Sequence, residues 1–258
     1  MISTALAGKK IIVTRPSGQA EGLAALIREA GGEALQIPAI EIRPLADAAP
    51  LLRVADRLES FDIAVFVSRN AVQSALELLR RRRAGKTWPA RLQVATVGQG
   101  SRAVLEANGF ARVIAPSAQS DSEGLLAMPE LADVRGKRVV IFRGDAGREV
   151  LGDELGRRGA VVEYVPCYRR VRPEAGDLGQ VWARGVDAVT VSSAEGLANF
   201  IDMLGREATE KLARVALFVP HARVAEEASR RGLGNAIVAG PGNAEMAAAL
   251  VAYFGGAR

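Results

Sequence analysis

The sequence has very little of the two residue types that most often build disulfides and metal centres. Its 258 residues include one cysteine, Cys167, and one histidine, His221. A single cysteine excludes an internal disulfide and is typical of a protein kept in a reducing compartment. One cysteine and one histidine also provide too few ligands for a structural zinc site. We therefore predict a cytoplasmic protein without a bound metal.

Long apolar runs and the common catalytic motifs are missing as well. No apolar run approaches the roughly 18 residues that a membrane span requires, so we predict no membrane partner. The chain has no G-x-S-x-G motif, and Gly85-Lys86-Thr87 lacks the upstream glycine of a phosphate-binding P-loop. A serine triad would depend wholly on His221, whose place after Pro220 at a helix start is typical of a surface residue.

The sequence does carry an excess of positive charge. The formal net charge of +5 favours an anionic partner, such as nucleic acid, a membrane surface or a small polyanion. The densest basic run is Arg80–Arg83, followed by Lys86. No aromatic residues interleave with this run, as base stacking would require, so we predict that it ends a helix over 70–83 and complements the helix dipole. We predict no nucleic-acid partner.

The chain is internally duplicated. Gly8–Arg15 matches Gly136–Arg143 at an offset of 128 residues, and the same offset pairs Pro38 with Pro166. Each copy predicts a strand, a turn after an arginine, a helix stopped by glycine and a second strand that ends at proline.

The correspondence continues downstream at smaller offsets. Ala64–Ser68 matches Ala188–Ser192 at an offset of 124, and Val94–Arg102 resembles Val215–Arg223 at an offset of 121. A repeat over nearly the whole chain predicts two similar domains.

Short apolar runs alternate with helical patterns in both copies, for example the run 139–142 and the predicted helix 147–158. This alternation predicts two α/β domains, each a doubly wound parallel sheet with helices on both faces. Ligands of such sheets bind at the carboxyl ends of the strands, and we expect the site in a cleft between the domains. The hydrophilic segments Ala39–Pro44 and Cys167–Pro173 are predicted to be connections.

Gly98–Ala103 follows a predicted strand, 93–97, and fits the dinucleotide-binding pattern G-x-G-x-x-G/A. The next predicted strand, Arg112–Ala115, leads into Pro116 and Ser117, where a ribose-binding carboxylate would be expected. The fragment is better explained as a helix start whose free N–H groups suit any anionic group.

Serines mark several other helix starts, where they commonly cap the first turn: Ser68, Ser122, Ser192 and Ser193. Their number favours more than capping, because many helix N-termini at strand ends would face one cleft and suit an anionic ligand.

Two further predictions come from the duplication. Arg15 and Arg143 occupy the same repeat position just past a strand end, which favours a carboxylate clamp over a surface ion pair. Tyr168 has Ile40 as its repeat counterpart, so the copies diverge there. A phenol is a neutral donor at physiological pH, so Tyr168 is either a buried structural residue or a proton donor beside the cleft.

Several blocks together resemble the uroporphyrinogen-III synthase family. They follow the family order from about residue 8 to residue 250: Val13–Pro16, Phe66–Val72, Val97-Gly98 with Ser101, Ser122–Leu125, Arg143-Gly144 with Gly147-Arg148, Tyr168–Arg170 and Val191–Ser193.

This resemblance implies that the second domain is inserted into the first through a two-stranded connector. Residues 1–38 and 172–258 would form one domain, and residues 42–168 the other. It implies a lyase of tetrapyrrole biosynthesis that cyclises hydroxymethylbilane to uroporphyrinogen III, with loss of water and inversion of ring D. The enzyme would need no cofactor, would be a monomer and would receive its substrate from the preceding enzyme of the pathway.

The resemblance also implies roles for individual residues. Tyr168 would assist departure of the hydroxyl group, and Ser68, Ser101, Ser192 and Ser193 would hold acetate and propionate groups. The other predicted substrate-binding residues are Arg15, Ser122, Arg143, Arg148 and His221. His221 stands where many members of the family carry a hydroxyl residue, which leaves its role open.

Two other functions also fit the residues. One is an NAD(P)-dependent oxidoreductase built on Gly98–Ala103, and the other is a non-catalytic two-domain protein that binds an anionic small molecule.

Overall fold

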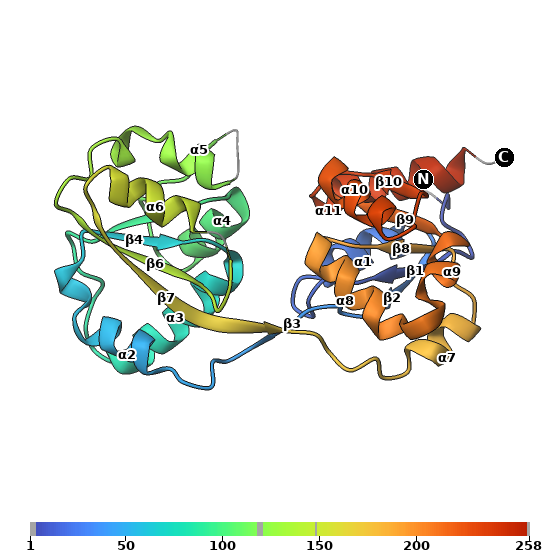
Figure 1. The fold of residues 1–258 in the computed structure, drawn as a ribbon, viewed down its shortest axis with the longest axis horizontal. Coiled ribbons are helices and arrows are strands. Elements are labelled where there is room, and N and C mark those ends of the chain that lie inside the picture. Colours follow the sequence, from blue (N-terminus) through green and yellow to red (C-terminus); the bar gives the residue numbers. More distant parts are fainter. Residues whose placement is uncertain (1–3, 118–120, 148, 257–258) are drawn as a thin grey trace. The chain divides into compact units, whose positions relative to one another are not determined.

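The computed structural model describes residues 4–117, 121–147 and 149–256. The chain divides into two compact units: the first consists of Met1–Glu41 and Val171–Arg258, and the second of Ile42–Arg170. Two stretches of chain therefore pass between the units. They include two neighbouring strands, β3 (Glu41–Arg43) and β7 (Val161–Val171) (Figure 1).

The first unit is built around a five-stranded sheet in the order β10-β9-β8-β1-β2. Its strands are β1 (Lys10–Val13), β2 (Glu33–Gln36), β8 (Ala188–Thr190), β9 (Ala216–Val219) and β10 (Ala236–Val238). Strand β1 pairs in parallel with β2 on one side and with β8 on the other. The N-terminal stretch thus supplies strands that complete a sheet begun by the C-terminal stretch.

Helices cover both faces of this sheet because the buried strands are apolar on both sides. Ile11 and Val13 pack into one core and Ile12 into the other. The first core includes α1 (Glu21–Glu29) and α11 (Asn243–Gly255). The second includes α7 (Leu178–Ala183), α8 (Ala194–Leu204), α9 (Ala208–Ala213) and α10 (Ala222–Arg230), with the short η3 (Gly205–Glu207) between α8 and α9.

The second unit repeats this plan around a sheet in the order β3-β7-β6-β4-β5. Its other strands are β4 (Ile63–Phe66), β5 (Gln93–Thr96) and β6 (Arg138–Gly144), which pair in parallel, as do β6 and β7. One core holds α2 (Ala49–Asp56), η1 (Leu58–Ser60), α3 (Arg69–Arg82) and α4 (Gln99–Ala107); the other holds α5 (Ser122–Leu126), η2 (Pro129–Leu131) and α6 (Val150–Arg157). Two mainly parallel sheets with helices on both faces confirm the predicted α/β class.

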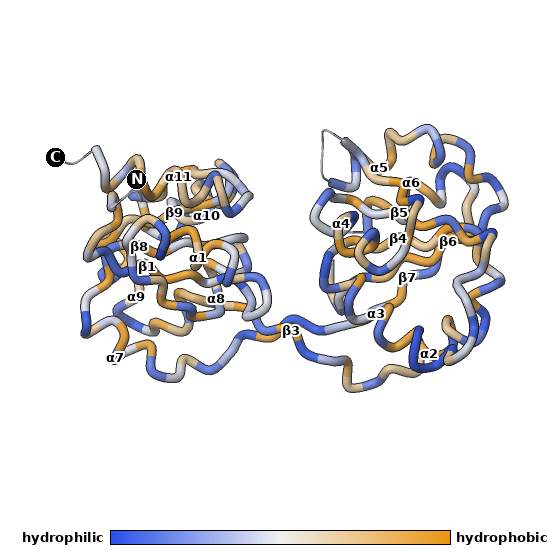
Figure 2. Tube along the Cα trace, turned by 180° about the vertical axis from the view of Figure 1, so that it is seen from behind, coloured by the Kyte–Doolittle hydropathy of each residue, from blue (hydrophilic) through white to orange (hydrophobic). Residues whose placement is uncertain are grey.

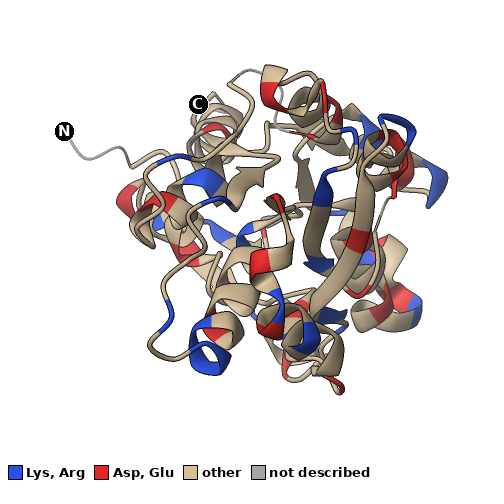
Figure 3. Cartoon of the chain, turned by 90° about the vertical axis from the view of Figure 1, so that its left-hand side faces the viewer, with Lys and Arg blue, Asp and Glu red and all other residues tan. Residues whose placement is uncertain are grey.

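The strands form the hydrophobic centre of each unit (Figure 2). Basic and acidic side chains are interspersed over the helices that surround them (Figure 3). None of the helices within the described ranges is long and apolar enough to cross a membrane.

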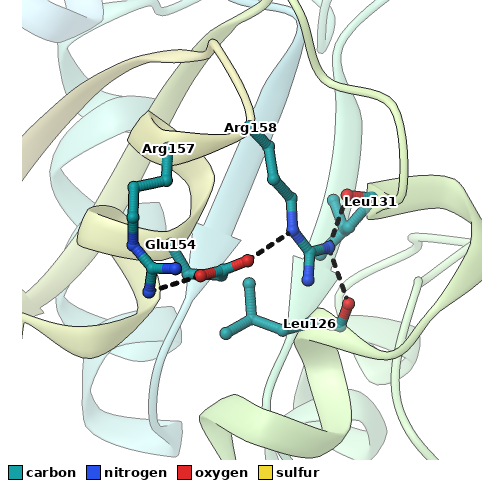
Figure 4. A network of polar contacts seen from close by, with 5 residues as sticks. All are labelled: Leu126, Leu131, Glu154, Arg157 and Arg158. Carbon is teal, nitrogen blue, oxygen red and sulfur yellow. Dashed lines mark hydrogen bonds and ion pairs between the residues drawn. The ribbon is translucent and has the colours of Figure 1, made fainter.

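A polar network ties the segment that contains α5 and η2 to α6 (Figure 4). Nη1 of Arg158 donates hydrogen bonds to the carbonyl oxygens of Leu126 and Leu131, at 2.8 and 2.9 Å. Glu154 forms ion pairs with both Arg157 and Arg158. The network satisfies carbonyl groups where α5 and η2 end, which otherwise have no partner within the helix.

Three predicted elements differ from the structure. Strand β7 does not end at Pro166 but continues to Val171, so Cys167–Pro173 is not simply a connection. Strand Arg112–Ala115 is absent, because only Ile114 forms a bridge, with Ala95, and Pro116 has no N–H to extend the pairing. Helix α6 begins at Val150, three residues later than predicted, since Gly147 has a φ of +147° that no helix allows.

A β-bulge lies near the end of β7. Arg143 pairs with Pro166, but the next residue of β6, Gly144, pairs with Tyr168, so Cys167 is the extra residue. Proline is tolerated beside a bulge because the ladder of hydrogen bonds is already interrupted there. The bulge turns Tyr168 to the face of the sheet that carries Phe142 and α3.

Candidate functional site

In the second unit, the predicted site residues collect at the carboxyl ends of the strands. Ser68 follows β4, Ser101 lies in the first turn of α4 after β5, and Arg143 lies near the end of β6. Tyr168 lies in the late part of β7, beside the end of β6. This edge is where ligands of parallel α/β sheets bind.

The structure brings two of these residues into direct contact. The hydroxyl oxygens of Ser68 and Tyr168 lie 3.1 Å apart, and either can be the donor. Ser68 also caps α3, because its Oγ accepts a hydrogen bond from the N–H of Ala71 at 3.1 Å. Since the N–H of Ala71 occupies one lone pair of that oxygen, the Ser68 proton is available to Tyr168. When Ser68 donates, the proton of Tyr168 can be given to another acceptor.

Tyr168 is held firmly by its surroundings. Its side chain is only 2% exposed and belongs to the core that contains Phe66 and Phe142, which stack with ring centroids 4.9 Å apart. The ring lies against Gly144: a Cβ there would come within 3.1 Å of Cζ and 3.3 Å of Oη of Tyr168. The bulge and this glycine together fix the position of the phenol.

Arg143 lies on the other face of β6, with Ile141 and Tyr164. Its guanidinium stands 4.9 Å from the centre of the Tyr164 ring and 4.0 Å from the carboxylate of Glu149, and the residue is 8% exposed. The hydroxyl of Tyr164 is fixed in turn, because it accepts from the N–H of Gly152 and donates to the carbonyl of Glu149. Arg148, which was predicted to bind substrate, lies outside the described residues.

Ser101 and Ser122 differ in their surroundings. Ser101 is 6% exposed in the first turn of α4. Ser122 does not cap α5 as predicted; Asp121 does, with Oδ1 accepting from the N–H of Gly124 at 2.8 Å. An aspartate is as good a cap as serine and carries a charge that suits the helix dipole. Ser122 is instead the first residue of the helix and is half-buried.

In the first unit, the predicted residues also follow strand ends. Ser193 caps α8, since its Oγ accepts from the N–H of Gly196 at 3.0 Å, and Ser192 precedes it. Arg15 follows β1, and its Nη2 donates to the carbonyl of Pro241 at 2.9 Å. His221 is the exposed N-cap of α10, but its side chain makes no capping hydrogen bond. The edge of this sheet therefore carries hydroxyl, guanidinium and imidazole groups beside helix N-termini.

Sequence reasoning did not identify the buried threonines that stiffen both edges. The hydroxyl of Thr96 donates to the carbonyl of Phe66 at 2.6 Å, and that of Thr14 to the carbonyl of Thr190 at 2.9 Å. Each threonine holds the end of a neighbouring strand from which a site residue follows. The signal was a polar residue at or just past the end of an otherwise apolar strand, in both copies.

The glycine-rich fragment after β5 has a local explanation. A Cβ at Gly100 would come within 2.7 Å of Nε of Arg69, so this glycine accommodates the Arg69 side chain. The strand Arg112–Ala115, expected to precede the ribose-binding position, is also missing. The dinucleotide interpretation therefore loses both of its supports in the fold.

Cys167 is not a candidate nucleophile. Burial raises the pKa of its thiol to about 12, and its Sγ donates to the carbonyl of Val165. The thiolate is the reactive form, so a thiol with such a pKa stays inert at neutral pH. Within the described ranges, no cluster of three or more His, Cys, Asp or Glu side chains forms a metal site.

Fold and site together define a class: a two-unit α/β protein that presents hydroxyl groups, guanidinium groups and helix N-termini at the carboxyl edges of two parallel sheets. Such an edge suits an anionic small molecule.

Comparison with known proteins identifies the family. The family model "Uroporphyrinogen-III synthase HemD" matches residues 21–248. The uroporphyrinogen-III synthase of Escherichia coli K12 is 34% identical over 193 residues, which cover 72% of this chain and 76% of that protein. The enzyme of Salmonella typhimurium LT2 is 32% identical over 229 residues, 86% of this chain and 91% of that protein. The chain belongs to the uroporphyrinogen-III synthase family, as the ordered blocks predicted.

Solved structures agree in fold. The uroporphyrinogen-III synthetase of Helicobacter pylori 26695 matches with a TM-score of 0.63 at 14% identity, over 95% of this chain and 99% of that chain. A mutant of the uroporphyrinogen III synthase of Thermus thermophilus matches with a TM-score of 0.61 at 18% identity, over 94% and 97%.

Proposed function

We propose that this chain is a lyase that converts hydroxymethylbilane to uroporphyrinogen III, with loss of water and inversion of ring D. The observation that carries the mechanistic part is the hydrogen bond between Ser68 and Tyr168, at 3.1 Å, at the ligand-binding edge of the second sheet. It supplies a positioned proton donor in a chain whose one thiol is inert.

Tyr168 is the proposed proton donor to the departing hydroxyl group, which leaves as water. Ser68 is proposed to support this step by donating its own hydrogen bond to the phenol oxygen as the proton leaves, which stabilises the developing negative charge. The remaining chemistry, closure through a spiro-intermediate, requires that a flexible linear tetrapyrrole be held so that the correct carbon attacks. Positioning of this kind can provide a large part of a rate enhancement.

The acetate and propionate groups of the substrate are the proposed ligands of the helix N-termini and arginines. Ser193 and the N-terminus of α8, and Arg15 beside β1, would act in the first unit. Ser68 and Ser101 at the starts of α3 and α4, and Arg143 beside α6, would act in the second. Arg143 is well suited, because its guanidinium is oriented by Tyr164 yet its nearest carboxylate is 4.0 Å away.

The finer parts of the proposal concern the cell. The single cysteine, in a chain without a possible internal disulfide, fits a reducing compartment, and we propose the cytoplasm. We also propose that the chain acts as a monomer and takes its unstable linear substrate from the enzyme that makes it.

One assay tests the proposed function. Hydroxymethylbilane is supplied to the purified protein without added metal or nucleotide, and the type III and type I isomers are separated. We expect the type III isomer to form in excess of the type I isomer that arises spontaneously. Formation of the type I isomer alone, with the protein folded, would reject the proposal.

A further inference from the structure

The second unit contains a large cavity beside the β5 edge of its sheet. Its volume is about 1160 Å³, at the upper end of the roughly 300–1,000 Å³ typical of small-molecule sites. The walls come from the C-terminal half of α3, the loop 86–92, and the chain that follows α4, residues 108–115. The cavity exists because this last segment pairs with β5 at Ile114 only.

Two aromatic side chains form one wall. Trp88 and Phe110 meet edge to face, with ring centroids 4.9 Å apart. Nε1 of Trp88 donates to the carbonyl of Leu92 at 3.0 Å, so the indole is held in place and its polar group is satisfied. Both side chains are only half-buried. A fixed, partly exposed aromatic wall is suited to contact a flat apolar body.

The charged side chains that line the cavity are almost all basic. They are Arg80, Arg83, Lys86, Arg91, Arg102 and Arg112, against a single acid, Glu130. Arg83 and Arg102 already form ion pairs, with Glu59 and Glu106. Arg91 and Arg112 are exposed and form no ion pair with any residue that the structure describes.

The fold thus adds what the sequence around the basic run did not contain. Trp88 follows Arg80–Arg83 closely, and Phe110 arrives from beyond α4. Solvated surface cations would explain the arginines alone. They would not explain why the guanidinium groups of Arg91 and Arg112 line the same large cavity as an aromatic pair.

We propose that this cavity binds a flat aromatic or conjugated molecule that carries several negative groups. The body of the ligand would contact Trp88 and Phe110, and its anionic groups would pair with Arg91 and Arg112. The site is separate from the carboxyl edge of the sheet, where Ser68 and Tyr168 lie, and does not depend on the proposed function. A carboxylated tetrapyrrole and a nucleotide share the required chemistry.

Binding of pyrenetetrasulfonate, a flat fluorescent polyanion, tests the proposal through the fluorescence anisotropy of the probe at low ionic strength. The variant is Arg91→Ala with Arg112→Ala. Its matched control is Arg53→Ala with Arg135→Ala, two arginines of the same unit that do not line the cavity. We expect the cavity variant to lower the affinity about tenfold, which corresponds to about 1.4 kcal/mol, and the control to leave it within about twofold. Equal affinities for both variants would overturn the proposal.

A second arm tests the aromatic wall. Trp88→Leu should weaken pyrenetetrasulfonate while circular dichroism stays unchanged, and butanetetracarboxylate, which has charge but no flat body, should fail to displace the probe. Displacement by the aliphatic anion as readily as by an aromatic one would overturn the aromatic part. Competition by uroporphyrin at lower concentration than ATP would assign the ligand to the tetrapyrroles, and the reverse order to nucleotides.

The isomer assay separates this site from the proposed function. The Arg91→Ala, Arg112→Ala variant should keep the type III activity of the unaltered chain. Loss of probe binding with retained activity supports a second site, whereas parallel loss of both would place the arginines in the substrate path and overturn it.

Discussion

At the scale of single residues, three side-chain positions define the proposed donor. Tyr168 lies on a bulge, Ser68 caps a helix and reaches its hydroxyl, and Gly144 leaves room for its ring. Each does something that its neighbours along the chain cannot do. The mechanism therefore makes residue-level predictions that separate packing from chemistry.

Tyr168→Phe should lower turnover by a factor on the order of 10²–10⁴, as for loss of a positioned general acid. The ring keeps its contacts in the core, so substrate affinity and thermal stability should change much less. Ser68→Ala should reduce turnover by a smaller factor, because the phenol proton remains. Steady-state kinetics with isomer separation gives the result. Near-normal turnover of Tyr168→Phe would make Tyr168 a packing residue.

Gly144→Ala should act on the same phenol without touching it chemically. The added Cβ would lie 3.1–3.3 Å from atoms of the Tyr168 ring, so the ring must shift. A displacement of this kind should lower turnover about tenfold to a hundredfold. Gly156→Ala is the matched control, since nothing lies within 4 Å of its Cβ. It should leave turnover unchanged and raise stability by about 1 kcal/mol through helix propensity.

Residue identities were predictable where the two copies diverge or where a helix starts. Tyr168 stood out because Ile40 occupies the equivalent place, and Ser68 because it precedes a helix. Their contact was not predictable, since it depends on a bulge that changes which face Tyr168 occupies. Asp121 was missed because serine and aspartate both cap helices, and only the backbone decides which of two neighbours does so.

At the scale of elements, α3 shows how a basic run can be structural. Arg81 pairs with Glu77, Arg82 with Asp56 and Arg83 with Glu59. These arginines end the helix, as predicted, and two of them tie it to α2 and η1. The Arg83 guanidinium, 7% exposed, also donates to the carbonyl of Ala55.

The pair of Glu59 and Arg83 predicts a pH dependence. The hydrogen bond from Arg83 holds the pKa of Glu59 at about 2, below its usual 4.5. The pair therefore stabilises the folded state fully above pH 4.5, and this contribution is lost as the pH falls from 4.5 towards 2. Thermal unfolding between about pH 6 and pH 3 measures it. Glu59→Gln should flatten the acid decline, while Glu77→Gln, at an exposed pair within α3, should not.

Element positions could be predicted where the copies match without gaps. The offset of 128 places β1 on the start of β6 and β2 on the start of β7. The offset of 121 was wrong, because the equivalent strands β5 and β9 end at Thr96 and Val219, 123 residues apart. Small loop differences shift a gapless match by two residues, which keeps the face of a strand but misplaces its end.

At the scale of the whole molecule, the two units differ in how their chains are arranged. The second unit is one continuous stretch, Ile42–Arg170, whereas the first needs Met1–Glu41 and Val171–Arg258 together. In the first unit β1 lies inside the sheet, between β8 and β2. Ile11, Ile12 and Val13 are completely buried there.

We expect residues 42–170 to fold alone, with a cooperative denaturant transition. Residues 171–258 alone should not fold, because removal of β1 and β2 exposes the edge of β8 and empties both cores. Residues 1–41 joined to 171–258 by a short glycine-serine linker should restore the fold. Circular dichroism of the three fragments decides it, and cooperative unfolding of 171–258 by itself would contradict this prediction.

The split of the first sheet sets a timetable for synthesis on the ribosome. Strand β1 leaves the ribosome early, but its partner β8 ends at Thr190 and β9 at Val219, after the entire second unit has been made. At about 5–20 residues per second, the first 41 residues wait roughly ten to thirty seconds for their partners. During that interval the apolar β1 and one face of α1 have no core to enter. The nascent chain therefore presents a sticky segment next to a unit that is already folded, and holdase chaperones should bind it there.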